Sequence, residues 1–168
     1  SIIAESFRAL RTNIQYLSVD KPKKIITITS SIGGEGKTFT SMNLASIFAV
    51  AKYKTILIGA DLRKPKLHKD FKIDETKGLS SYLINKSTIE DVVEKTDIEL
   101  LDVIGSGPIP PNPAELLDSK RMQNLIKELN TIYDYVIIDT PPIGLVTDGA
   151  IIMKHADINL YVVRHGYS

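Results

Sequence analysis

A glycine-rich stretch at residues 30–38 carries the clearest chemical signal in this sequence. It lies between an apolar, β-branched run at residues 25–29 and a helix-compatible run at residues 42–49. Glycines allow successive backbone N–H groups to approach a phosphate, and the following helix adds its positive N-terminal end. In such a loop Lys37 reaches the β- and γ-phosphates of a nucleotide, and the Thr38 hydroxyl coordinates Mg²⁺. The stretch therefore predicts a phosphate-binding loop.

One position of this loop departs from the standard pattern. The spacing G-x-x-x-x-G-K-[ST] requires a glycine where this chain has Ser31. The alternative interpretation is a glycine-rich turn followed by a chance Lys-Thr pair. We favour the phosphate loop because a strand-like and a helix-like run flank it as the motif requires. The residues assigned to nucleotide binding are Gly33, Gly34, Glu35, Gly36, Lys37, Thr38 and Phe39.

Two aspartates follow runs that resemble buried strands. Residues 55–58 lead to Asp61, and residues 135–138 end directly in Asp139. Ligands bind at the carboxyl ends of strands in open parallel sheets, and a carboxylate there can hold Mg²⁺ or accept a proton from a hydroxyl. For Asp61, an ordinary turn or cap aspartate is an equal alternative. Asp139 occupies the position that orients the Mg²⁺ shell in phosphate-loop proteins.

Two charged segments show no comparable chemistry. At residues 3–17, apolar side chains recur at steps of four and three, which predicts a helix with one apolar stripe. Glu5, Arg8 and Arg11 lie off that stripe, and from the residues alone we interpret them as an exposed, solvated ridge with one helical ion pair. A basic stretch at residues 63–72 is likewise interpreted as solvated; its alternative is a docking site for phosphate or an acidic peptide.

Length and composition narrow the class of protein. The chain has 168 residues, of which 43% are hydrophobic, enough for one domain with a substantial core. Its net charge of +1 gives no reason to expect a nucleic-acid partner. The lack of cysteine excludes disulfides, thiolate metal sites and a cysteine nucleophile. No apolar run approaches the roughly 20 residues of a membrane helix, so we expect a soluble piece.

Predicted strands alternate with predicted helices along the chain. Strands are expected at residues 25–29, 55–58, 98–104, 135–139 and 158–163, and helices at 3–17, 42–49, 113–132 and 147–155, with two short helices between 78 and 96. The second short helix opens with a capping box at residues 87–90, and the helix at 113 has Asn112 as its N-cap. This alternation predicts an α/β fold with a parallel sheet covered on both faces.

With these elements placed, the sequence resembles the bacterial tyrosine kinase family, the cytoplasmic kinase domains linked to exopolysaccharide chain-length control and export. Residues 29–38, 60–65 and 137–142 are similar to its Walker A, Walker A′ and Walker B segments. Residues 107–117 match a distinctive proline-rich stretch of the family. The resemblance implies a P-loop NTPase three-layer sandwich of the deviant Walker A group. It also implies that residues 1–168 form a single kinase domain, which we expect to be truncated at both ends.

The resemblance implies an activity: an ATP-dependent protein-tyrosine kinase that phosphorylates its own kind of chain. Lys37, Asp61 and Asp139 are then the catalytic residues, and ATP or ADP and Mg²⁺ are the ligands. Thr38, Asp61 and Asp139 would hold or orient Mg²⁺, and Asp61 would assist attack by a tyrosine hydroxyl. Catalysis of this kind is mostly positioning and charge neutralisation.

Partners and location are also implied by the resemblance. Glu5, Arg8 and Arg11 match an oligomerisation motif, which implies a homo-oligomeric ring and makes an intersubunit role likelier than plain solvation. The other implied partners are a transmembrane activator or a fused polysaccharide co-polymerase domain, and a cognate tyrosine phosphatase. The domain is expected to be cytoplasmic, at the inner face of the bacterial cell membrane.

Three departures from the family pattern bear on activity. The Walker A′ segment usually contains Asp-x-Asp, but its first position here is Gly59, so one acidic candidate is missing. Position 33, commonly proline, is glycine, which we expect to be benign. The family's C-terminal tyrosine cluster is absent; Tyr167 is the only tyrosine near the end.

Two alternative functions remain open at this point. Gly59 supports a catalytically weak nucleotide-binding module that acts through assembly. A partitioning-type ATPase switch is the other alternative. That group carries a lysine early in the loop, where this chain has Ile32.

Overall fold

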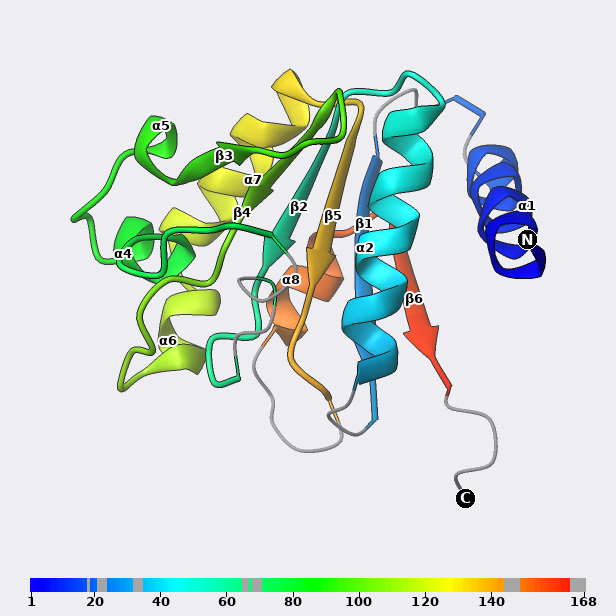
Figure 1. The fold of residues 1–168 in the computed structure, drawn as a ribbon. Coiled ribbons are helices and arrows are strands. Elements are labelled where there is room, and N and C mark those ends of the chain that lie inside the picture. Colours follow the sequence, from blue (N-terminus) through cyan, green and yellow to red (C-terminus); the bar gives the residue numbers. More distant parts are fainter. Residues whose placement is uncertain are drawn as a thin grey trace.

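A six-stranded sheet forms the centre of the molecule (Figure 1). This computed structural model describes residues 1–17, 19–20, 24–31, 35–64, 67, 71–143 and 149–163. The strand order is β3-β4-β2-β5-β1-β6. The strands are β1 (Lys24–Ser30), β2 (Thr55–Gly59), β3 (Val93–Lys95), β4 (Leu101–Ile104), β5 (Tyr135–Asp139) and β6 (Ile158–Val162). Every neighbouring pair is parallel except β3 with β4, so the predicted, mainly parallel sheet is confirmed.

Helices cover both faces of this sheet, which gives three layers (Figure 1). They are α1 (Ile2–Leu17), α2 (Glu35–Val50), α4 (Leu79–Leu83), α5 (Ile89–Val92), α6 (Pro113–Leu117), α7 (Lys120–Ile132) and α8 (Ala150–His155). Phe48 of α2 and Ile14 of α1 pack on one face of the sheet, whereas Leu125 of α7 and Ile152 of α8 pack on the other. The three central strands, β1, β2 and β5, are buried along their whole length. This double burial explains why all three strands are rich in apolar and β-branched residues.

Several predicted boundaries were wrong. The helix expected at 113–132 is two helices, because the Ser119 hydroxyl accepts a hydrogen bond from Met122 N at 3.2 Å and caps a new helix. The capping box lies one residue later than predicted, at Thr88 and Asp91. The strand expected from residue 98 begins at Leu101. Strand β3 was not predicted, since three residues are too few for a period to be recognised.

The start of β1 anchors α1. Lys24 begins the strand, one residue before its predicted start. Its buried Nζ donates hydrogen bonds to the carbonyls of Ile14 (2.8 Å) and Gln15 (3.3 Å). Both carbonyls belong to the last turn of α1, which has no intrahelical donors for them. Burial lowers the pKa of Lys24 from its ordinary value. A cation is thus held at the negative end of the helix.

Candidate active site

The candidate site lies where the carboxyl ends of β1, β5 and β2 meet the start of α2. Gly59 of β2 is in register with Asp139 of β5, and Ile28 of β1 is in register with Asp139 on the other side. Backbone bonds continue this alignment past the strands: Ala60 N donates to Asp139 O at 2.9 Å, and Thr140 N donates to Ile28 O at 3.0 Å. The sheet therefore fixes the Asp139 backbone from both sides.

Asp139 contacts both chemical groups of the phosphate-loop motif. Lys37 Nζ forms an ion pair with Asp139 Oδ1, and Thr38 Oγ1 donates to Asp139 Oδ2 at 3.4 Å. Each of these three residues is less than 7% exposed. The sequence places Lys37 and Asp139 about 100 residues apart, and the structure brings them into direct contact. Of the predicted loop residues, Gly33 and Gly34 and the side chain of Glu35 lie outside the described part of the chain.

Burial and the neighbouring charges act in opposite directions on Asp139. Burial raises the pKa of its carboxyl above the ordinary aspartate value, and the Lys37 ammonium opposes that rise. The Asp61 carboxylate adds a smaller upward contribution to the same pKa, so it lies near enough to act electrostatically on Asp139. Two carboxylates, one ammonium and one hydroxyl thus share this edge of the sheet.

The structure supports both interpretations of Asp61, as a turn aspartate and as a carboxylate of the site. Its Oδ1 accepts a hydrogen bond from Lys64 N at 3.2 Å, which is the behaviour of a turn aspartate. It also acts electrostatically on Asp139, as a site residue should. Its side chain is half-buried and therefore keeps contact with solvent. The turn interaction and the site position are compatible, because a carboxylate has two oxygens.

The space beside the Gly59 Cα, where a side chain would lie, is filled by Leu67 and Ser106. A Cβ placed on Gly59 would lie 2.9 Å from Leu67 Cδ1 and 3.0 Å from Ser106 Oγ. Leu67 is buried, and Ser106 Oγ donates a hydrogen bond to Gly59 O at 2.8 Å. Ser106 carried no recognisable signal in the sequence, because a serine after a strand has many ordinary roles.

The donor chemistry of this site fits Mg²⁺. Hydroxyl and carboxylate oxygens are its usual protein ligands, and it is commonly bound by one or two carboxylates together with substrate phosphates. Thr38, Asp61 and Asp139 supply such a set. In the described residues, no group of three or more His, Cys, Asp or Glu side chains could hold a metal by itself. A site completed by phosphates is consistent with that result.

The three residues of the N-terminal motif behave differently. Glu5 and Arg8 are exposed, as predicted. The prediction was wrong for Arg11, which is half-buried and donates from Nη1 to Ile47 O of α2 at 3.4 Å. Its Nε is buried without a hydrogen-bond partner in the described structure. Nearby, Phe7 of the same helix meets Phe39 edge-on, with ring centroids 6.1 Å apart.

The basic stretch is only partly described. Arg63, Lys64 and Lys72 are exposed, which agrees with the interpretation as a solvated face. The other basic residues of this stretch lie outside the described residues, as does Tyr167. No helix in the described ranges combines the length and apolar character needed to cross a membrane.

Comparisons with known proteins agree with this geometry. Residues 23–165 match a family described as AAA domain. The chain is 48% identical to the tyrosine-protein kinase YwqD of Bacillus subtilis over 166 aligned residues. This aligned region covers 99% of this chain and 70% of YwqD. It belongs to the bacterial tyrosine kinase family. The tyrosine-protein kinase CpsD of Streptococcus agalactiae is 44% identical over 163 residues, covering 96% of this chain and 69% of CpsD.

Solved structures of the kinase family share the whole fold. The chimerical protein CapA2B2 superposes with a TM-score of 0.94 at 44% identity, over 100% of this chain and 74% of that one. The kinase domain of the Escherichia coli tyrosine kinase ETK superposes with a TM-score of 0.93 at 38% identity, over 97% of this chain and 64% of the ETK chain. The MinD protein of Pyrococcus horikoshii, complexed with Mg-ADP, is less similar. It superposes with a TM-score of 0.71 at 25% identity, over 84% of this chain and 58% of the MinD chain. The kinase structures therefore resemble this chain more closely than MinD does.

Proposed function

We propose that this kinase domain transfers the γ-phosphoryl group of ATP to tyrosine hydroxyls, including those of its own kind of chain. The observation that carries the proposal is the buried contact of Lys37 and Thr38 with Asp139, which lies within the motifs of the tyrosine kinase family. In the reaction a bond forms between the tyrosine oxygen and the γ-phosphorus, the bond to the β–γ bridging oxygen breaks, and ADP leaves.

Each residue has a distinct role in this proposal. Lys37 donates to the β- and γ-phosphates, and Asp139 keeps its ammonium in place. Thr38, Asp139 and Asp61 hold Mg²⁺, which neutralises phosphate charge when bound. Asp61, which is half-buried and therefore accessible, accepts the proton of the attacking tyrosine hydroxyl. The residues proposed to line the nucleotide are Gly33, Gly34, Glu35, Gly36 and Phe39.

The relatives among the tyrosine-protein kinases support a proposed biological setting. We infer that the domain regulates the chain length and export of an exopolysaccharide at the inner face of the cell membrane. A transmembrane activator or a fused co-polymerase domain would bind it, and a tyrosine phosphatase would reverse its phosphorylation. Glu5, Arg8 and Arg11 of α1 would join copies into a ring. The exposure of Glu5 and Arg8 supports their contact with another subunit.

Phosphotyrosine formation tests the proposal. The full-length protein is incubated with Mg-ATP and compared with Lys37→Met and Gly59→Asp. We expect phosphotyrosine in the parent and at least a hundredfold less in Lys37→Met, because a phosphate donor is lost from the transition state. Hydrolysis of ATP without phosphotyrosine in any variant would contradict the kinase and support a switch.

Gly59 keeps one alternative function open. A domain without the first Walker A′ carboxylate could bind nucleotide and act only through assembly. If the parent forms no phosphotyrosine but Gly59→Asp does, that alternative is correct. Since a Cβ at position 59 would lie close to Leu67 and Ser106, the gain would require these side chains to shift.

A further inference from the structure

Ser106 links two segments that lie far apart in the sequence. It follows β4, the residue is 6% exposed, and its hydroxyl reaches the end of β2 and the segment that follows it. Ser106 Oγ donates to Gly59 O at 2.8 Å and lies 3.5 Å from Asp61 O. It therefore bonds to the backbone on either side of Ala60, in the turn that carries Asp61.

The backbone of Ser106 is held rigidly from the opposite side. Leu79 N donates to Gly105 O at 2.7 Å, and Ser80 N donates to Ser106 O at 2.9 Å. A Cβ on Gly78 would come within 2.5 Å of the backbone of Gly105, so the start of α4 lies directly against this loop. A loop fixed by such contacts can hold a neighbouring turn in place.

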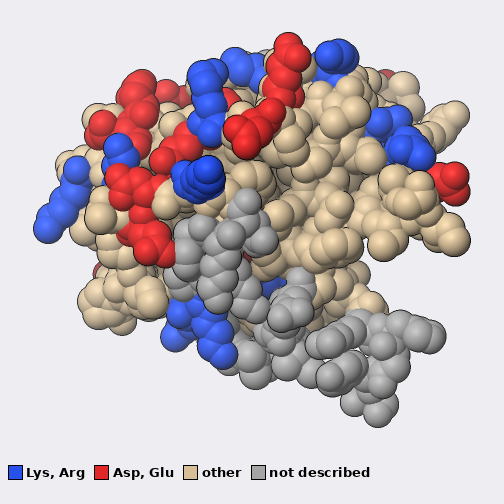
Figure 2. Space-filling model, in the orientation of Figure 1, with Lys and Arg blue, Asp and Glu red and all other residues tan. Residues whose placement is uncertain are grey.

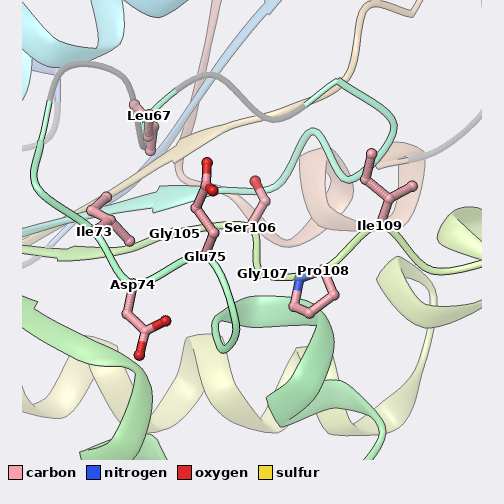
Figure 3. A pocket seen from close by; sticks show the side chains of 9 residues that line it. All are labelled: Leu67, Ile73, Asp74, Glu75, Gly105, Ser106, Gly107, Pro108 and Ile109. Carbon is pink, nitrogen blue, oxygen red and sulfur yellow. The ribbon is translucent and has the colours of Figure 1, made fainter.

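A pocket of about 250 Å³ shows the surroundings of this serine (Figure 3). Ser106 and Leu67 line it, together with Ile73 and the loop that continues to Ile109. Figure 3 shows the Ser106 side chain directed away from Pro108, on the side where the chain leaving β2 passes. The Ser106 hydroxyl thus connects the loop after β4 to the end of β2.

We propose that Ser106 is a positioning residue for Asp61 in the phosphoryl transfer, through its hydrogen bonds to the Walker A′ turn. The absence of a side chain at Gly59 permits this arrangement, because a Cβ there would lie only 3.0 Å from Ser106 Oγ. The inference rests on the proposed kinase function. Ser106 itself touches neither Lys37 nor Thr38 in the described contacts, so its loss should act on the transfer step through Asp61 and leave the affinity for ADP without Mg²⁺ unchanged.

Ser106→Ala tests this role in the full-length protein. We expect the kcat of phosphotyrosine formation to fall about tenfold, as is typical when a residue that orients a site carboxylate is lost. The Kd for ADP, measured without Mg²⁺, should stay within about twofold of the parent. Ser119→Ala is the matched control, because Ser119 also donates its hydroxyl to a backbone carbonyl, Leu116 O, and lies in the α6–α7 connection. An unchanged kcat in Ser106→Ala would overturn the inference.

A double-mutant cycle with Gly59→Ala separates positioning from general damage. This variant adds a Cβ without a carboxylate and displaces the Ser106 hydroxyl, so its loss of kcat should resemble that of Ser106→Ala. We expect the double variant to be no slower than the slower single variant, because both remove the same interaction. If the two losses of kcat multiply in the double variant, or if the affinity for ADP without Mg²⁺ falls together with kcat, the positioning role is contradicted.

Lys37→Met distinguishes this inference from the proposed function. If Lys37→Met abolishes phosphotyrosine and Ser106→Ala does not lower it, the kinase stands and the Ser106 role fails. If the parent forms no phosphotyrosine, the proposed function fails, and the Ser106 role fails with it.

Discussion

Asp139 joins a buried cation and a hydroxyl through its two oxygens. The Asp139 side chain is 5% exposed and the Lys37 side chain is 4% exposed, so neither charge is well solvated. Removing one partner from such a pair leaves the other charge buried and uncompensated. The Lys37 side chain consequently sets the electrostatic state of Asp139 as well as contacting phosphate.

Lys37→Met should raise the pKa of Asp139 further. Burial already raises it above the ordinary value, and the ammonium is the largest opposing influence. Without that charge we expect the pKa of Asp139 to rise further, because burial is then opposed only by hydrogen bonding to Thr38. Carboxyl titration by carbon-13 NMR measures it, with Lys64→Met as a control that removes an exposed cation from the Walker A′ turn. Equal Asp139 pKa values in parent and Lys37→Met would show that the ion pair is absent in solution.

At the scale of elements, single polar groups decide where helices stop, start and dock. The Ser119 hydroxyl starts α7 after α6 has ended at Leu117. Lys24 caps the last turn of α1 from the neighbouring strand. Both contacts satisfy backbone groups that the helices themselves leave unpaired.

Ser119→Ala should lower the free energy of unfolding by about 1 kcal/mol, because it removes the N-cap of α7. Urea denaturation provides the measurement. Ser119→Asp retains a cap acceptor and should stay within a few tenths of a kcal/mol of the parent. A loss of equal size in both variants would mean that the cap is not the cause.

Lys24→Met should loosen α1. The substitution keeps most of the buried volume but leaves the carbonyls of Ile14 and Gln15 without their donor, a loss of about 1–3 kcal/mol. Hydrogen exchange should show faster exchange along α1 and unchanged exchange in β5. Lys54→Met, at a solvent-exposed lysine, is the control. Unchanged protection of α1 would argue that the apolar stripe alone holds it.

At the scale of the whole molecule, charges of both signs are spread over the surface. Figure 2 shows them intermixed on one face, with acidic side chains gathered over the region of α5 and β3. The exposed acidic residues in and beside these elements are Glu90, Asp91, Asp97 and Glu99. Helix α1 lies at the edge of the molecule against α2, and Ile3 and Leu17 of its apolar stripe are more than half exposed (Figure 1). One side of this helix therefore packs on the fold, and its exposed residues are where the proposed contact with another copy would form.

Arg8→Ala and Arg11→Ala should separate assembly from folding. Arg8 is exposed, so its loss should weaken the proposed ring and leave the free energy of unfolding within about 0.5 kcal/mol. Arg11 also bonds to Ile47 O of α2, so its loss should in addition reduce stability by about 1 kcal/mol. Sedimentation velocity and urea denaturation give the two readouts. Identical stability of the two variants would refute the distinction.

Local sequence determined the chemical identity of the site. The loop at residues 30–38 and the strand ending in Asp139 are local patterns, because each needs only neighbouring residues to form a turn or a strand. The apolar and β-branched residues of β1, β2 and β5 likewise predicted that these strands are buried. Lys37, Thr38 and Asp139 could therefore be named together, and the structure confirms that they meet.

Only the tertiary structure determined which residues that are distant in the sequence contact each other. Ser106 reaches the Walker A′ turn because β4 lies beside β2, and Arg11 turns toward Ile47 because α1 packs on α2. Lys24 caps a helix that ended seven residues earlier. No periodicity or motif encodes such contacts, since they depend on the packing of whole elements and on the need of buried backbone groups for partners.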